Sequence, residues 1–377
     1  MLLQCLHCLL ERRNTVKRYI FTPPTNFLIM IDAKYCLSNT KPVIPSVPVG
    51  IIGVGSYLPP QVVKNSDFTN IKLSAEELSF LENQGGNRER RWAGSETYTD
   101  MAIKAAKNAV ENAGIDILEV DMVVVTHISR DIKQLTPPNS VLIQTALGAR
   151  NATAINVDQG FTSWMYALIT GASFVASGFY KTVLVVSGET ILGNTDSPIM
   201  KSMLVGDGAG AFVLRRTEPG YGMLGYHMMS DQYPDIAAGV RVETAVAAPF
   251  DTEESLRAYF TIAPNSFQRD FPFVENFLPY SVHQCLGALA MNPDEVDHYI
   301  FAQKIDWINR RWAANVGVDY SKVHETIATT ACVETSSIPI VTSDAQQKGK
   351  LKKGDLVLFA DLGSNWSVAS ALFRWCI

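Results

Sequence analysis

The chain has 377 residues, of which 47% are apolar and 18% are charged, and its formal net charge is −5. This composition is typical of a globular protein that can bury a large core in one large domain or two moderate ones. The body carries no basic stripe, and no apolar run reaches the roughly 18 residues that a spanning helix needs, so nucleic-acid-binding and integral membrane proteins are excluded.

The six cysteines indicate a reducing setting. They lie far apart except for Cys5 and Cys8, and a chain of this size can fold without disulfide bonds. We therefore expect a cytoplasmic protein.

Residues 1–48 differ from the rest of the chain. They hold three of the six cysteines and several basic residues, with little periodicity. The stretch 1–10 is apolar but has no preceding basic region and no small-residue cleavage site, which argues against a secretory signal. We expect an N-terminal extension outside the fold, with Met30 as an alternative start, and a targeting peptide stays open as the other interpretation.

From Val49 onward, short apolar runs alternate with Ala-rich helical stretches, which is the pattern of a layered α/β protein. Continuous apolar runs predict strands that are covered on both faces, and they occur at Val123–Thr126, Val183–Ser187, Tyr299–Phe301 and Leu356–Ala360. Helical spacing predicts a helix over Met101–Ala113, ended by Gly114.

The segment 155–168 carries the most information about function. A short strand, Ala154–Val157, leads through the corner Asp158-Gln159-Gly160 into a helix rich in Ala, Leu and Ile. The start of a helix concentrates N–H donors and positive potential, so a thiol there would be activated as a thiolate. The residue at this position is Phe161, which cannot act as a nucleophile.

Two sequence patterns recur in the same order and predict an internal duplication. The first pattern is a helix followed by the segment 114–121 and an apolar strand, and it recurs as a helix followed by the segment 291–297 and another strand. The second pattern is the run 181–189, which resembles the run 353–363. We predict two halves, residues 49–218 and 219–377, that meet near residues 215–225.

Several motifs together resemble the β-ketoacyl-acyl-carrier-protein synthase III family of the thiolase-like superfamily. They are Gly53-Val54-Gly55-Ser56-Tyr57-Leu58-Pro59 with Asn65 and Asp67, Arg88-Glu89-Arg90-Arg91, Gly206-Asp207-Gly208-Ala209-Gly210-Ala211, and Ser370-Ala371-Leu372. The resemblance runs from about Val49 to the end of the chain. It implies an α/β, thiolase-like fold of two pseudo-duplicated halves in a five-layered αβαβα arrangement.

The resemblance also implies a catalytic triad of Cys, His and Asn, in which the cysteine carries the acyl group and the other two side chains bind the thioester oxygen. Those three positions fall on Phe161, Ala302 and Cys332 in this sequence. Relatives that prime from coenzyme A hold the nucleotide with Trp and Arg, at positions that become Phe80 and Gln84 here, and the family's triple-glycine loop becomes Gly363-Ser364-Asn365. We therefore expect an inactive condensing site, no cofactor and no metal.

The resulting hypothesis is a non-catalytic subunit of an acyl-transfer or condensing enzyme in fatty-acyl or polyketide-type secondary metabolism. The resemblance implies a homo- or heterodimer with a triad-bearing ketosynthase paralogue, and an acyl carrier protein as a further partner. The alternative is an altered acyltransferase or thioester hydrolase that uses Cys332 or Ser163, and a third option is a non-covalent binder of acyl chains or carrier protein. A buried cysteine and a helix-start serine are also ordinary structural residues.

Overall fold

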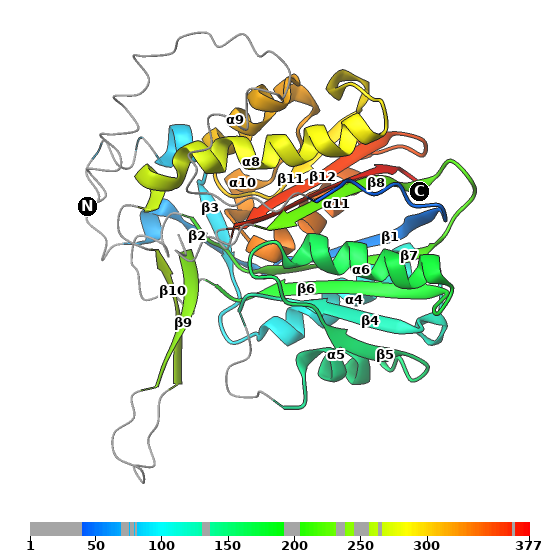
Figure 1. Ribbon diagram of the computed structural model, residues 1–377. Coiled ribbons are helices and arrows are strands. Elements are labelled where there is room, and N and C mark those ends of the chain that lie inside the picture. Colours follow the sequence, from blue (N-terminus) through cyan, green and yellow to red (C-terminus); the bar gives the residue numbers. More distant parts are fainter. Residues whose placement is uncertain are drawn as a thin grey trace.

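Two β-sheets lie face to face with a pair of helices between them and further helices on both outer sides (Figure 1). The computed structural model describes residues 40–68, 75, 79, 81–129, 136–191, 204–230, 238–244, 256–262, 266–363 and 366–377. The layers run helices, sheet, helices, sheet, helices, which is the expected five-layered αβαβα arrangement.

The first sheet has five strands in the order β1-β7-β6-β4-β5. Their bounds are β1 Val49–Tyr57, β4 Met122–Thr126, β5 Thr153–Asn156, β6 Thr182–Glu189 and β7 Gly208–Arg216. Its outer face is covered by α4 (Tyr98–Asn112) and α5 (Asn139–Leu147). Its inner face packs on α6 (Ser163–Ser177) and α11 (Ser337–Gln347).

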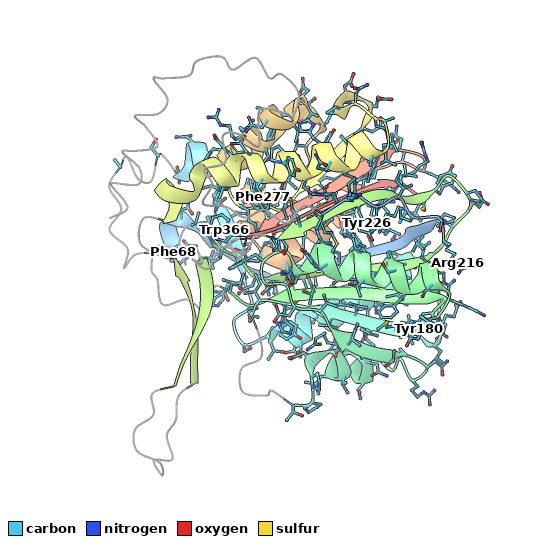
Figure 2. All side chains as sticks on the ribbon, in the orientation of Figure 1. Phe68, Tyr180, Arg216, Tyr226, Phe277 and Trp366 are labelled. Atoms are coloured by element: carbon cyan, nitrogen blue, oxygen red, sulfur yellow. The ribbon has the colours of Figure 1, made fainter. Side chains whose placement is uncertain are left out.

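The second sheet has four strands in the order β11-β12-β13-β8. They are β8 Gly222–Ser230, β11 His298–Phe301, β12 Leu356–Gly363 and β13 Ser367–Arg374. The helices α6 and α11 reach this sheet from the inner side, while α8 (Ser266–Ala288) and α9 (Asp306–Val316) form the outer layer. Figure 2 shows the side chains that fill these layers, among them Phe277 of α8 and Trp366, which share the outer core.

Shorter elements lie outside the two main sheets. Two small sheets pair β2 (Gln61–Lys64) with β3 (Glu89–Trp92) and β9 (Ala238–Thr244) with β10 (Leu256–Ile262), and the second pair projects from the body in Figure 1. The helix α10 spans Ile327–Thr330. Single turns lie at Asn65–Asp67, Leu81–Gly85, Ile117–Glu119, Pro293–Glu295, Tyr320–Lys322 and Glu334–Ser336.

The two sheets repeat one pairing scheme. The antiparallel pairs β1·β7 and β7·β6 and the parallel pair β6·β4 recur as the antiparallel pairs β8·β13 and β13·β12 and the parallel pair β12·β11. This repetition confirms the predicted pseudo-duplication. The chain passes from β7 to β8 between Arg216 and Gly222, and the division at residue 218 stays a prediction.

The four strands predicted from continuous apolar runs all form, because these runs are buried between helical layers. The strand predicted at Ala154–Val157 also forms, one residue earlier, as β5. The predicted helix forms as α4 and begins three residues earlier than expected. It begins after Thr97, whose side chain accepts a hydrogen bond from the Asp100 backbone N–H while the Asp100 carboxylate accepts one from Thr97 N–H.

Glycines in β1 let α4 approach closely. A Cβ placed on Gly55 would lie 2.3 Å from the backbone nitrogen of Ala109, and one on Gly53 would lie 2.5 Å from the Ala109 carbonyl oxygen. Only glycine permits this contact between backbones. The motif that contains Gly53 and Gly55 therefore has a packing role.

Residues 40–48, part of the expected N-terminal extension, lie against the second sheet. Val43 and Tyr226 exchange backbone hydrogen bonds of 2.8 and 2.9 Å, so this segment covers the outer edge of β8. Residues 1–39 lie outside the described part of the chain. Among the described residues, no helix is long and apolar enough to cross a bilayer.

Candidate active site

Phe161 lies two residues before α6, at the turn that the sequence predicts. Gly160 has a φ of +58°, and the Asp158 carboxylate accepts a hydrogen bond of 3.1 Å from its N–H. The Ser163 hydroxyl donates to the Gly160 carbonyl at 2.6 Å and accepts from the Gln159 N–H at 2.7 Å. The turn is thus held by local hydrogen bonds, and the Ser163 hydroxyl is fully used within it.

The Phe161 ring is buried in a small apolar cluster and is 6% exposed. The cluster consists of the buried residues Phe161, Ile191 and Val205 and the partly buried Phe68, Ile128 and Leu204. The Lys304 ammonium lies 5.6 Å from the Phe161 ring centroid, a distance at which a cation is attracted to the ring face. Figure 2 shows Phe68 toward the end of the molecule from which β9 and β10 project.

Cys332 lies beside this cluster because its backbone pairs with the segment that holds Val205. The Cys332 N–H donates to the Leu204 carbonyl at 2.8 Å, and the Gly206 N–H donates to the Cys332 carbonyl at 2.9 Å. A Cβ on Gly206 would lie 2.1 Å from the Thr330 carbonyl oxygen, so only glycine allows this pairing. This constraint accounts for the glycine that begins the motif at 206–211.

Ala302 follows β11 and is fully buried. Its N–H donates to the Ala360 carbonyl at 2.9 Å, and its carbonyl accepts from the Lys304 N–H at 3.0 Å. This turn directs Lys304 toward Phe161. The structure therefore brings Phe161, Cys332 and the loop that holds Ala302 and Lys304 into one region.

Lys304 belongs to a charged group that sequence reasoning missed. Its ammonium lies 2.7 Å from a carboxylate oxygen of Glu334 and 3.7 Å from Asp361 Oδ1. Burial alone would lower the pKa of Lys304, but the negative charges of Glu334 and Asp361 outweigh it and hold the pKa above its ordinary value. Lys304 is therefore a fixed cation, not a general base.

Asp361 lies on β12 and is 1% exposed. Burial raises its pKa to about 6, although the charge of Lys304 acts in the opposite direction. The Leu362 backbone N–H and the Lys304 ammonium, which lies 3.7 Å from Oδ1, also favour the charged form. A buried acid of this kind is costly unless a donor reaches it.

The Cys332 thiol is 3% exposed. Burial and the negative charge of Glu334 raise the pKa of Cys332 well above its ordinary value. The resting form is a neutral thiol, so attack on a carbonyl requires a base that removes its proton during the reaction.

The backbone on both sides of Cys332 is unusual. Ala331 has a φ of +54° and Glu334 a φ of +40°, in the left-handed region that favours glycine. Such conformations each cost about 1–3 kcal/mol and persist only where the surrounding contacts impose them. This strained backbone holds the Glu334 carboxylate 2.7 Å from the Lys304 ammonium.

A second buried carboxylate, Glu189, ends β6 near the Phe161 cluster. It accepts hydrogen bonds of 2.9 Å from the N–H groups of Ile128 and Ser129, and further bonds from the hydroxyls of Ser129 and Thr335. Burial raises the pKa of Glu189 to about 7, against the hydrogen bonds from Ser129 and Thr335. Glu189 connects the loop after β4, the end of β6 and the turn that precedes α11.

The remaining predicted positions lie apart or outside the described residues. Phe80, Ser364 and Asn365 are outside the described part of the chain, and only the backbone of Gln84 is described, in the turn Leu81–Gly85. Gly363 ends β12. Among the described residues, no group of three or more His, Cys, Asp or Glu side chains could hold a metal ion.

The chain was compared with known proteins. The family model described as 3-oxoacyl-[acyl-carrier-protein] synthase III matches residues 155–232, and the model of its C-terminal part matches residues 286–375. A β-ketoacyl-[acyl-carrier-protein] synthase III of Oceanobacillus iheyensis is 30% identical over 329 residues, which cover 87% of this chain and 99% of that protein. The corresponding protein of Caldanaerobacter subterraneus is 29% identical, with 87% and 98% covered.

Solved structures agree with this relationship. The 3-oxoacyl-[acyl-carrier-protein] synthase III of Aquifex aeolicus has a TM-score of 0.76 and 27% identity, and the comparison covers 87% of this chain and 100% of that one. The priming β-ketosynthase of the R1128 polyketide pathway has the same fold, with a TM-score of 0.74 and 23% identity over 90% and 99% of the two chains. Together, these similarities show that the chain belongs to the β-ketoacyl-[acyl-carrier-protein] synthase III family.

Proposed function

We propose that this chain is a ketosynthase III-like protein of fatty-acyl or polyketide-type biosynthesis whose own condensing site is inactive. It acts as the partner subunit of an acyl-transfer or condensing enzyme. The observation that carries the proposal is Phe161, a buried ring at the position that the family resemblance assigns to the nucleophile, with Lys304 facing it.

The chemistry of the neighbouring residues supports a loss of condensation. Ala302 has no hydrogen-bonding side chain, and the thiol of Cys332 is a weak donor. Loss of one oxyanion donor typically costs about 10²- to 10³-fold in rate, and here two donors and the nucleophile are replaced. The carboxylates of Glu334 and Asp361 would also repel the negative oxygen that forms during attack on a thioester.

A partner subunit is supported by the first sheet. β5 pairs with β4 on one side, and its outer edge has no strand beside it among the described residues. An unpaired edge strand readily pairs with another chain. By family resemblance the partner is a triad-bearing ketosynthase paralogue in a dimer, and an acyl carrier protein delivers the acyl chain.

The alternative function, an altered acyltransferase or thioester hydrolase, is favoured at Cys332 over Ser163. The hydrogen bonds found for the Ser163 hydroxyl join only backbone groups, whereas the negative charge of Glu334 acts on the Cys332 thiol. A serine without a neighbouring base is a poor nucleophile. Catalytic release of free thiol from an acyl thioester would support this alternative.

Co-purification from the native host tests the partner role. A tagged chain should bring down a ketosynthase paralogue that carries Cys, His and Asn, in a 1:1 ratio, and the complex should condense acyl groups. A homodimer that condenses malonyl-carrier protein without any other chain would contradict the proposal.

A further inference from the structure

Two histidines meet at the end of the second sheet that lies away from the candidate active site. His298 begins β11, whereas Ala302 follows the other end of that strand. His324 reaches the same place from the segment after the turn Tyr320–Lys322, because its backbone N–H donates to the Tyr299 carbonyl at 2.9 Å. The ring centroids of the two histidines lie 4.9 Å apart, and His324 Nε2 lies 3.0 Å from His298 Nδ1. Ring nitrogens from two separate segments therefore face each other.

The Asp355 carboxylate fixes the orientation of His298. Asp355 precedes β12, the parallel neighbour of β11 (Figure 1), and its Oδ2 lies 3.1 Å from His298 Nε2. The same oxygen accepts a hydrogen bond of 2.8 Å from the Lys352 N–H, which holds the carboxylate in place. Because a carboxylate only accepts, the proton of a neutral His298 lies on Nε2, and its Nδ1 presents a lone pair toward His324. A carboxylate behind a histidine is the arrangement that orients imidazole ligands in metal sites.

The distance between the two nitrogens suits a metal ion. Imidazole nitrogens bind zinc at about 2.0–2.1 Å, so two of them on one ion lie about 2.8–3.4 Å apart at the angles of octahedral or tetrahedral coordination. The separation of 3.0 Å between His324 Nε2 and His298 Nδ1 falls in this range. An ion takes the place of the shared hydrogen when the proton of His324 moves from Nε2 to Nδ1 and both rings turn a lone pair toward the ion. This exchange leaves both rings neutral.

The pair is open to solvent on one side. The side chains of His298 and Asp355 are 20% and 25% exposed, while His324 is buried. Asp355 contacts the far nitrogen of His298, and no third His, Cys, Asp or Glu side chain among the described residues completes a ligand set here. The two rings are therefore the protein ligands, and water from the open side occupies the remaining positions of the ion.

The charges around His324 balance. The carboxylate of Asp344 favours a cation beside His324, and the ammonium groups of Lys348 and Lys350 disfavour one. Lys348 is itself paired with Asp344 at 2.8 Å. Together with Asp355, two carboxylates stand against two ammonium groups, so the surroundings do not repel a divalent ion as a whole.

We propose that His298 and His324 form a binding site for a divalent transition-metal ion, with Asp355 as the residue that orients His298. Imidazole ligands suit Zn²⁺, Ni²⁺ and Cu²⁺. The sequence alone predicts no metal, because the two histidines are 26 residues apart and match no metal-binding motif. The ion joins the start of β11 to the segment before α10, so the site is independent of the condensing site.

The experiment is titration of the full chain with Zn²⁺, followed by isothermal calorimetry. Every protein used carries Cys5→Ser and Cys8→Ser, because the spacing of these two cysteines could bind zinc by itself. We expect one Zn²⁺ per chain at micromolar concentrations. Binding should be at least about 100-fold weaker in His298→Gln and in His324→Gln, which remove a ligand, and about 10- to 100-fold weaker in Asp355→Asn, which removes the orienting charge.

His283→Gln is the matched control. His283 lies in α8, and its Nε2 is 3.3 Å from the Asn315 carbonyl oxygen, so this variant removes one imidazole from the protein without touching the pair. It should leave the affinity and the stoichiometry for Zn²⁺ unchanged. No saturable binding, equal losses in His283→Gln and His298→Gln, or unchanged binding in a folded His298→Gln would overturn the proposal.

A spectroscopic measurement keeps the test valid if a histidine variant does not fold. X-ray absorption of the chain with intact histidines, loaded with one equivalent of Zn²⁺, should show two imidazole nitrogens at about 2.0–2.1 Å from the ion. One imidazole or none would contradict the site. Absence of Zn²⁺ binding leaves the partner role intact, because co-purification and condensation test that role independently.

Discussion

At the scale of single residues, the site is defined by charges that pair inside the protein. Lys304 forms ion pairs with the buried carboxylates of Glu334 and Asp361, and its ammonium lies over the Phe161 ring. Removing one member of a buried charge pair leaves the others without compensation, which costs more than the pair itself contributes. The candidate site is therefore also a point on which stability depends.

Lys304→Met tests this dependence. The variant keeps the length of the side chain but leaves Glu334 and Asp361 unpaired, so we expect a loss of about 3 kcal/mol in the free energy of unfolding, measured by urea denaturation. The matched control is Lys348→Met, which removes the exposed pair with Asp344 and should cost less than about 0.5 kcal/mol. Equal losses in the two variants would contradict the assigned role of Lys304.

At the scale of elements, close backbone packing and one buried acid hold the layers together. Gly53 and Gly55 bring α4 onto β1, and Glu189 joins β6 to the loop after β4 and to the turn before α11. The close packing at Gly53 and Gly55 joins the outer helix α4 to the first sheet. The hydrogen bond between Glu189 and Thr335 joins the first half of the chain to the second half.

Gly55→Ala should destabilise the protein by several kcal/mol, because the added Cβ meets backbone atoms that cannot move alone. Gly287 is the matched control, since it lies within α8 and nothing lies within 4 Å of an added Cβ. Gly287→Ala should stabilise the protein by roughly 0.5–1 kcal/mol through helix propensity. Thermal unfolding of both variants compares these opposite signs directly.

Glu189 predicts a pH dependence of stability. Its pKa is about 7 in the folded protein and 4.5 in its ordinary state, so between these values the folded protein holds a proton that the unfolded chain has released. Stability therefore falls as pH rises through this window, by up to about 1.4 kcal/mol per pH unit.

Glu189→Gln does not titrate, so the wild-type stability should fall relative to this variant between about pH 5 and pH 7. Urea denaturation at several pH values measures the difference. Parallel pH profiles of the two proteins would show that Glu189 does not titrate in this range.

At the scale of the whole molecule, the fold could be predicted from the sequence because its signals are local. The buried strands are continuous apolar runs, and the repeated order of motifs predicts two similar halves, which the matching pairing of the two sheets reflects. The course of residues 40–48 could not be predicted, because the pairing of Val43 with Tyr226 joins segments far apart in sequence.

The candidate site was predictable only in part, for the same reason. Motif position located Phe161, Ala302 and Cys332, whereas Lys304, Glu334 and Asp361 are single charged residues in three separate segments. Such residues usually lie in solvent, and only the fold brings them within 4 Å. The one available signal was that Lys304 and Glu334 each lie two residues after a predicted triad position.

The central claim is that this chain does not condense at its own site, and one assay tests it most directly. The purified chain is incubated with an acyl-coenzyme A primer and malonyl-carrier protein, and release of carbon dioxide is measured for the wild type and for Phe161→Cys. We predict no release above the rate without protein in either case, since the restored thiol still lacks both oxyanion donors. Release by the wild-type chain, or its appearance with Phe161→Cys alone, would contradict the account.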